Sequence, residues 1–364
     1  MLTVIIFLLI LGLLVLVHEL GHFQVARRLK IGVEEFGLGF PPRAWSKVKK
    51  GITYSLNWIP LGGFVKIKGE NGEAPAEADS FSFQPFWKKT LVLVAGVFMN
   101  VLLGWVLLTF SLIIGMPGAI DKGSIDQNQS VQIIQVIPKS AAFQAGLQIG
   151  DVVKSINQQS FNTPEDYVKY INLHRDESLT IGYLRDQTEF KVTAKPTILP
   201  GQNNKVLGLQ LAQVGLISYP WWQAPAEAFK LTIFILWQII SSLINLIVSL
   251  INGLGLNASL AGPVGVAVMT GQMVDLGFRY VIQFAALLSL NLAVVNILPI
   301  PALDGGRLLF ALIEKLRRRP NRASLENAFH QTGFVVLLCL VALITYKDIA
   351  LYAADWWQKL NKFF

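Results

Sequence analysis

The chain has 364 residues, of which 53% are hydrophobic and 15% are charged. This composition is too apolar for an ordinary soluble enzyme and predicts a polytopic membrane protein. The single cysteine, Cys339, excludes an intramolecular disulfide and a cysteine-rich zinc site, so a metal would need His and carboxylate ligands. The net charge of +8 does not indicate a nucleic-acid partner, because Lys and Arg gather between hydrophobic segments rather than on one recognition helix.

An uncharged apolar run, residues 1–17, leads directly into His18, Glu19 and His22. Side chains four positions apart project from one face of a helix, so both imidazoles can reach one Zn²⁺ while Glu19 acts as general base. The run lacks the basic start and small-residue cleavage site of a signal peptide. The pattern predicts a zinc motif inside a membrane helix, against the simpler interpretation of polar residues that cap or snorkel.

Two histidines leave zinc one protein ligand short, and Asp304 is the best candidate for the third. Prolines before Asp304 end one helix and glycines after it can begin another, so a plain N-cap is an alternative that remains compatible with ligation. Asn291 and Asn296 precede it, and their amides would bind substrate, stabilise an oxyanion or bond a neighbouring helix. For Asn100, in the second span, we favour the purely structural interpretation.

Three further apolar segments, residues 90–114, 280–299 and 333–352, are long enough to cross a membrane. Lys and Arg cluster between the first two spans and again in residues 307–322. The positive-inside rule makes both basic stretches cytoplasmic, so we expect both termini to be external.

Residues 229–251 are also apolar and of spanning length, with Lys230 as the only charge. A crossing there would turn the basic stretch 315–322 outward and separate Asp304 from His18 by the bilayer. We therefore expect an amphiphilic or re-entrant element on the outer side and four true spans, while hydropathy alone leaves a fifth span open.

Two segments between the spans have the character of β-structure. In residues 52–68 apolar positions alternate around a Gly-Gly turn, which predicts a hairpin that either dips into the protein interior or lies on its surface. Residues 130–195 mix charges of both signs with short Val- and Ile-rich runs, which predicts a small soluble domain. Its expected strands are residues 131–137, 152–157, 179–184 and 189–194, and Thr163 opens an expected helix over 164–173.

Taken together, HELGH in a first span, the Gly-Gly hairpin, the soluble insert and NILPIPALDGG in a later span resemble the bacterial site-2 proteases, the intramembrane zinc metalloproteases of peptidase family M50. The resemblance covers nearly the whole chain and implies zinc as cofactor. The positions that match the family motifs are His18, His22 and Asp304 for zinc, Glu19 for catalysis, and Asn291 and Asn296 for substrate contact.

Smaller similarities extend this resemblance. Residues 59–65 look like the family's re-entrant β-loop, in which Gly62, Gly63 and Phe64 would hold an extended substrate segment by strand addition. Residues 141–157 are similar to the PDZ signature of the single-PDZ members. Residues 260–265 resemble a segment that follows the family's outer amphiphilic helix, whereas Val97 stands where the family commonly has proline.

The expected fold is a polytopic α-helical membrane protein of four transmembrane helices, with a membrane-associated β-hairpin and one inserted α+β PDZ domain. In chain order we expect a transmembrane helix with HExxH (1–28), a cytoplasmic or re-entrant β-loop region (29–89), a second transmembrane helix (90–115), an extracytoplasmic PDZ domain (120–200), an outer amphiphilic segment (220–275), a third transmembrane helix with NxxPxPxLDG (278–306), a cytoplasmic basic segment (307–331) and a fourth transmembrane helix (332–355).

The expected function is a zinc metalloendopeptidase that cuts transmembrane segments of single-pass proteins in regulated intramembrane proteolysis, with anti-sigma factors and signal-peptide remnants as substrates implied by the resemblance. The rivals are a non-proteolytic PDZ scaffold or chaperone and a zinc protease whose site faces bulk water. Expected partners are a substrate transmembrane segment, a peptide or protein ligand of the PDZ domain and the lipid bilayer. The expected location is the bacterial inner membrane, with the active site near the cytoplasmic side.

Overall fold

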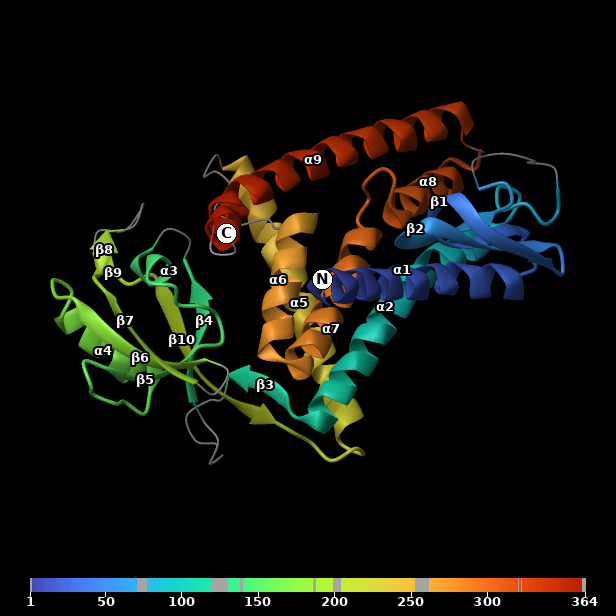
Figure 1. Ribbon diagram of the computed structural model, residues 1–364. Coiled ribbons are helices and arrows are strands. Elements are labelled where there is room, and N and C mark those ends of the chain that lie inside the picture. Colours follow the sequence, from blue (N-terminus) through green and yellow to red (C-terminus); the bar gives the residue numbers. More distant parts are fainter. Residues whose placement is uncertain are drawn as a thin grey trace. The chain divides into compact units, whose positions relative to one another are not determined.

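The computed structural model describes residues 2–70, 77–119, 130–137, 140–185, 188–198, 204–252, 262–319, 321 and 323–361. The chain divides into two compact units (Figure 1): Met1–Ser111 with Trp221–Phe364, and Leu112–Pro220. Parts of the expected features lie outside the described residues: 71–76 of the β-loop region, 120–129, 138–139, 186–187 and 199–200 of the PDZ domain, 253–261 of the outer amphiphilic segment, and 320 and 322 of the basic segment.

Within the described residues, five helices are long and apolar enough to cross a membrane. Each contains a window of 18 mainly apolar residues with few charges, and 20 helical residues already extend about 30 Å. The multi-pass character expected from the sequence is therefore confirmed, whereas the number of crossings is not decided by length alone. The five are α1 (Leu2–Arg28), α2 (Phe86–Ile114), α5 (Ala224–Ile251), α7 (Phe278–Ile297) and α9 (Ala323–Asn361).

Small residues allow α1, α2 and α7 to pack closely. A Cβ at Gly21 of α1 would lie 2.5 Å from the carbonyl oxygen of Ala95 on α2, and one at Gly104 of α2 would lie 2.6 Å from Leu290 Cδ2 on α7. The hydrophobic effect does not favour the association of helices in lipid, so helices there associate largely through close van der Waals packing at small residues. Further along, Leu14 of α1 belongs to an apolar cluster with residues of α7.

Two shorter helices complete this unit. The helix α6 (Pro263–Leu276) begins beside α9, where the buried Asp348 carboxylate accepts hydrogen bonds from the backbone N–H groups of Gly262 and Gly265 at 2.9 and 2.7 Å. This carboxylate satisfies backbone donors that the first turn of a helix leaves free. The helix α8 (Asp304–Arg317) follows α7 after a short loop.

The strands β1 (Val33–Lys49) and β2 (Ile52–Ile67) form an antiparallel hairpin in the same unit. The chain reverses at Lys50 and Gly51, both with positive φ, between the two strands. It reverses again within β2, between residues 56 and 63, where Gly62 has a φ of +79°, so the turn expected near the Gly-Gly pair is present. Residues 35–38 have strand partners both at 53–56 and at 63–66, so the ribbon folds back on itself. This fold-back brings the far end of β2 to α1.

The second unit contains a six-stranded sheet in the order β3-β10-β4-β5-β6-β7. Its core packs Ile133, Ile156, Leu179 and Ile181 against Tyr167 of α4. Thr163 caps α4 by accepting a hydrogen bond from the Asp166 N–H, as expected. The elements are β3 (Met116–Ala119), β4 (Ser130–Val136), α3 (Ala141–Gln144), β5 (Val152–Ile156), α4 (Pro164–Leu173), β6 (Leu179–Arg185), β7 (Thr188–Ala194) and β10 (Leu209–Ile217), with a separate pair β8 (Thr197–Ile198) and β9 (Lys205–Val206).

The four strands expected between residues 130 and 195 are present within one or two residues at each end. The strands β3 and β10 were not expected from the sequence. They extend the second unit beyond the expected limits of 120–200, and along the chain they adjoin α2 and α5.

Candidate metal centre

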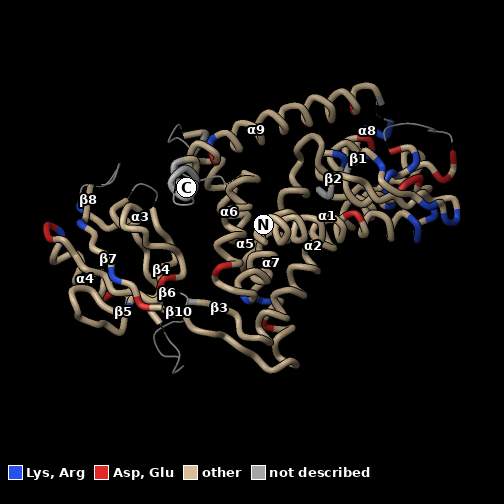
Figure 2. The backbone as a smooth tube through the Cα atoms, in the orientation of Figure 1, with Lys and Arg blue, Asp and Glu red and all other residues tan. Residues whose placement is uncertain are grey.

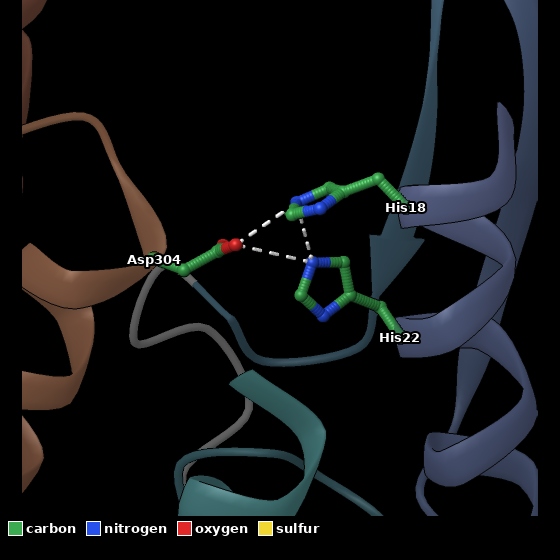
Figure 3. A group of neighbouring side chains, drawn as sticks. All are labelled: His18, His22 and Asp304. Atoms are coloured by element: carbon green, nitrogen blue, oxygen red, sulfur yellow. Dashed lines mark hydrogen bonds and ion pairs between the residues drawn. The ribbon is translucent and has the colours of Figure 1, made fainter. Parts of the chain in front are cut away.

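His18 and His22 of α1 face Asp304, the first residue of α8 (Figure 3). The Oδ2 atom of Asp304 lies 2.9 Å from His18 Nε2 and 3.3 Å from His22 Nε2, and the two Nε2 atoms are 3.2 Å apart. Both imidazoles are buried. The helical spacing of the histidines and the turn after α7 therefore bring together the three residues that the sequence predicted as a set.

The outer nitrogen of each imidazole is held by α2. His22 Nδ1 lies 2.8 Å from the carbonyl oxygen of Val92, which can only accept a hydrogen bond. His18 Nδ1 lies 3.2 Å from the side-chain amide of Asn100, which is fully buried. The Nε2 atoms are consequently the ring nitrogens that remain able to bind a metal ion.

The amide of Asn100 fixes the tautomer of His18. The amide oxygen, Oδ1, has no hydrogen-bond partner among the described residues when the NH₂ group is turned towards the ring. Rotating the amide by half a turn exchanges its oxygen and NH₂ group, which have nearly the same size and shape. In that orientation the Asn100 Oδ1 atom accepts a hydrogen bond from His18 Nδ1–H, and His18 Nε2 carries a lone pair.

These contacts test whether a metal fits. With both Nδ1 atoms protonated, two imidazole lone pairs and a carboxylate oxygen converge, with all ligand atoms within 4.8 Å of one another. The Oδ2 atom of Asp304 is buried and accepts no hydrogen bond of sound geometry from the described residues. Three convergent acceptors require a cation, and two imidazoles with one carboxylate form a ligand set that zinc uses in catalytic sites. The residues present fit zinc.

Glycine provides the space for this cluster. A Cβ at Gly96 of α2 would lie 2.4 Å from His22 Nε2 and 2.7 Å from His18 Cε1. Gly305 and Gly306 likewise allow the first turn of α8 to pack against carbonyl groups of the loop that follows α7. A Cβ at these positions would lie 2.1 Å from the Leu298 oxygen and 2.3 Å from the Ile300 oxygen. The glycines of LDGG thus set the position of Asp304.

Glu19 points to the hairpin. Its Oε2 atom accepts a hydrogen bond of 3.0 Å from the backbone N–H of Val65, and a Cβ on Gly63 would lie 3.9 Å from its Cγ. Residues 63–65 of β2 therefore run alongside the carboxylate. Phe64 packs over Gly37 of β1, where a Cβ would overlap its ring.

The two asparagines of α7 have different surroundings. The amide nitrogen of Asn296 lies 3.3 Å from His18 Nε2, at the metal centre. The amide of Asn291 donates to the Leu287 carbonyl of its own helix at 3.0 Å. Five residues rotate a helix by about 140°, so the two amides do not share a face.

The loop that carries Asp304 is anchored by α9. His330 Nδ1 accepts a hydrogen bond of 3.0 Å from the backbone N–H of Ala302, which has a φ of +71°. Gly333 leaves room for Pro301, since a Cβ there would overlap the proline ring. Lys89 of α2 forms an ion pair of 2.9 Å with Glu314 of α8, and Arg307 pairs with Glu70.

Sequence reasoning did not find Gly96, Val92, Val65 or His330. A signal existed for one of them, because Gly96 and Asn100 are four apart and so share a face of α2. Every residue has a backbone carbonyl, so no residue type indicates which one will bind a side chain, and the same holds for a backbone N–H. The contacts of Val92 and Val65 therefore had no sequence signal.

Comparison with known proteins places these features in one family. The model of peptidase family M50 matches residues 6–340. A Clostridium perfringens relative that carries a zinc metalloprotease name is 33% identical over 92% of this chain and 95% of its own. The regulator of sigma-W protease RasP of Bacillus subtilis is 28% identical over 95% of this chain and 97% of its own.

Among solved structures, a PDZ domain of a Listeria innocua SdrC-like protein matches 22% of this chain and 92% of its own, at 20% identity and a TM-score of 0.21. The family match and the zinc metalloprotease relatives both span nearly the whole chain. The chain therefore belongs to peptidase family M50, the site-2 type, and is a zinc metalloprotease.

Proposed function

We propose that the chain is an intramembrane endopeptidase that hydrolyses peptide bonds within transmembrane segments of single-pass proteins. The observation that carries this proposal is the convergence of Asp304 with His18 and His22, which lie on α1, a helix long and apolar enough to span a membrane. In this role the three side chains hold zinc. Bound zinc supplies Lewis-acid chemistry, which makes water a stronger nucleophile at neutral pH.

Glu19 is the general base in this proposal. Its carboxylate takes the proton of the attacking water and passes it to the nitrogen of the leaving amine. Asn296, whose amide adjoins the centre, donates to the carbonyl oxygen that gains negative charge. Asn291, further along α7, contacts the substrate backbone instead.

The hairpin presents an extended substrate to Glu19. A peptide bond in a helix is shielded by its own hydrogen bonds, so the substrate segment must unwind before attack. We assign this task to Gly62, Gly63 and Phe64, through strand addition beside β2. The hydrogen bond from Val65 to Glu19 supports the assignment, since it joins the strand to the base.

We further propose four crossings, with α5 on the outer surface. α1 and α7 run in the same direction, because His18 meets Asn296 at one end while Ile6 and Val281 join one cluster at the other. α2 runs the opposite way, so the segment from α2 to α7 makes an even number of crossings. The 14 residues of α6 extend only about 21 Å, less than the hydrocarbon core of about 30 Å.

The two exposed faces of α5 support this placement. Apolar residues recur at intervals of three and four along one face: Phe229, Ile233, Trp237, Ile240 and Ile244. Gln238, Ser242 and Asn245 follow the same interval on a nearly opposite face and are also exposed. A helix with an apolar face opposite a polar one lies in a membrane interface more readily than across lipid.

The remaining assignments follow from this topology. The site lies near the cytoplasmic side of the bacterial inner membrane, and the unit Leu112–Pro220 is an extracytoplasmic PDZ domain that binds a peptide or protein ligand. Substrates are segments left by an earlier cut, such as anti-sigma factors and signal-peptide remnants. The Bacillus subtilis relative is named a regulator of sigma-W protease, which supports the first class.

Co-expression with tagged single-span substrates tests the proposal. We expect the Glu19→Gln variant to keep zinc and lose cleavage by a factor of 10² to 10⁴, whereas His22→Ala and Asp304→Ala lose both zinc and cleavage. Glu227→Gln, an equal change on α5, serves as the control. Full cleavage by Glu19→Gln would refute the mechanism, and a cellular function that survives this change would favour the scaffold.

A further inference from the structure

An open basic hollow lies where α1 ends against the hairpin. Its volume is about 520 Å³, and its lining includes Arg27, Lys47, Lys49 and Lys50, with Trp45 and Tyr54. Figure 2 shows Lys and Arg gathered at this end of α1 and around β1 and β2. Its lining shares no residue with the cluster of His18, His22 and Asp304, so the hollow is a separate feature.

Strand alternation creates this surface. Successive side chains of a strand point to opposite faces, so Trp45, Lys47 and Lys49 share a face of β1. Their cross-strand partners include Tyr54, which stands opposite Lys47. Arg27, in the last turn of α1, also lines the hollow.

The nearby carboxylates are already engaged by other cations. Glu35 binds Arg43 at 2.8 Å and Glu34 binds Lys66 at 2.7 Å. No ion pair within the described residues includes Lys47, Lys49 or Lys50, which are exposed. The hollow thus holds a concentrated positive charge that an anion would neutralise.

The place of the hollow in the fold indicates the source of that anion. The 27 residues of α1 extend about 40 Å, so its last turn lies at the headgroup level of a bilayer with a core of about 30 Å. Trp45 is 56% exposed beside the lysines. Tryptophan at this depth favours the membrane interface, and juxtamembrane Lys and Arg attract anionic lipids.

We propose that this hollow binds the phosphate of an anionic phospholipid from the adjacent leaflet. Arg27 offers two parallel donors to phosphate oxygens, the lysines add point charges, and Trp45 and Tyr54 contact the glycerol and upper acyl chain. The bound lipid fixes the hairpin to the bilayer surface. Because the same β2 strand ends beside Glu19, lipid binding positions the strand that meets the substrate.

Native mass spectrometry of the full-length protein in detergent provides the test. The probes are phosphatidylglycerol, zwitterionic phosphatidylcholine and inorganic phosphate, each added alone. We expect tight binding of phosphatidylglycerol only, weakened at least tenfold when Lys47, Lys49 and Lys50 are all changed to Gln, since each juxtamembrane charge contributes about fivefold. The control changes Arg317, Arg318 and Arg319 to Gln, which removes the same charge at the end of α8 and leaves binding intact.

Three results would overturn the proposal: equal phosphatidylglycerol binding by wild type and pocket variant, an equal loss in the α8 control, or inorganic phosphate that binds as tightly as the lipid. Zinc content of each variant reports whether it is folded. If the triple variant loses zinc, the single change Lys49→Gln is measured instead, with an expected weakening of about fivefold.

Discussion

The helices α2 and α5 have almost the same length and similar apolar composition, yet they have different surroundings. In their most apolar windows, 39% of the α2 residues are buried, against 6% in α5. α2 presents Val92, Gly96 and Asn100 to the two histidines, whereas α5 exposes an apolar face and a polar one. The comparison teaches that apolar length identifies candidate spans, while packing contacts decide which of them build the site.

The largest effect should come from Gly96→Ala. The added methyl group would overlap His22, and a displacement of about 1 Å at a catalytic centre can cost 10²-fold in rate. We expect loss of bound zinc together with loss of cleavage. Gly12→Ala on α1, where a Cβ meets nothing within 4 Å, is the control and should be silent. A zinc content in Gly96→Ala equal to that of the wild type would contradict the claim that α2, unlike α5, shapes the metal centre.

Next in size is Asn100→Leu, which removes the acceptor for His18 Nδ1–H. Loss of such a supporting hydrogen bond lowers metal affinity about 10- to 100-fold. Asn100→Asp keeps an acceptor and should retain most of the affinity, measured by competition with a chelator. Asn245→Leu on α5 should change nothing. Equal affinities for the Leu and Asp variants would show that Asn100 only fills space.

A smaller effect is expected from Lys89→Met at the start of α2. The Lys89 side chain is 8% exposed and that of Glu314 is 31% exposed, so the change leaves the partly buried Glu314 carboxylate without this ion pair. We expect a loss of about 1–2 kcal/mol, between the values for buried and exposed pairs. Thermal unfolding in detergent measures it. Lys230→Met, which breaks an exposed pair on α5, should cost less than about 0.5 kcal/mol.

The smallest functional effect belongs to α5 itself. In a Cys339→Ser background, Asn245→Cys should leave cleavage unchanged and should react with a membrane-impermeant maleimide added from outside. A cysteine in place of the buried Asn100 should stay unreacted in the same assay. Protection of residue 245, or labelling only from the cytoplasmic side, would contradict the outer placement of α5.

The three candidate zinc ligands, which the structure brings together, could be predicted from sequence because HELGH is a local spacing and LDGG a distinctive helix start. The capping residue Thr163 with Pro164 predicted α4 for the same reason. By contrast, the roles of Gly96 and His330 depend on which helices touch, which no local pattern encodes. The strand β1 was missed because Pro41 and Pro42 argue against a strand.

The central claim is that His18, His22 and Asp304 hold one zinc ion at a common depth in the membrane. X-ray absorption at the zinc edge of the purified protein tests it most directly. We predict one zinc per chain, with two imidazole nitrogens at about 2.0–2.1 Å and oxygen as the remaining ligands, and loss of the metal in Asp304→Ala. A sulfur ligand, or full zinc retention without Asp304, would contradict the account.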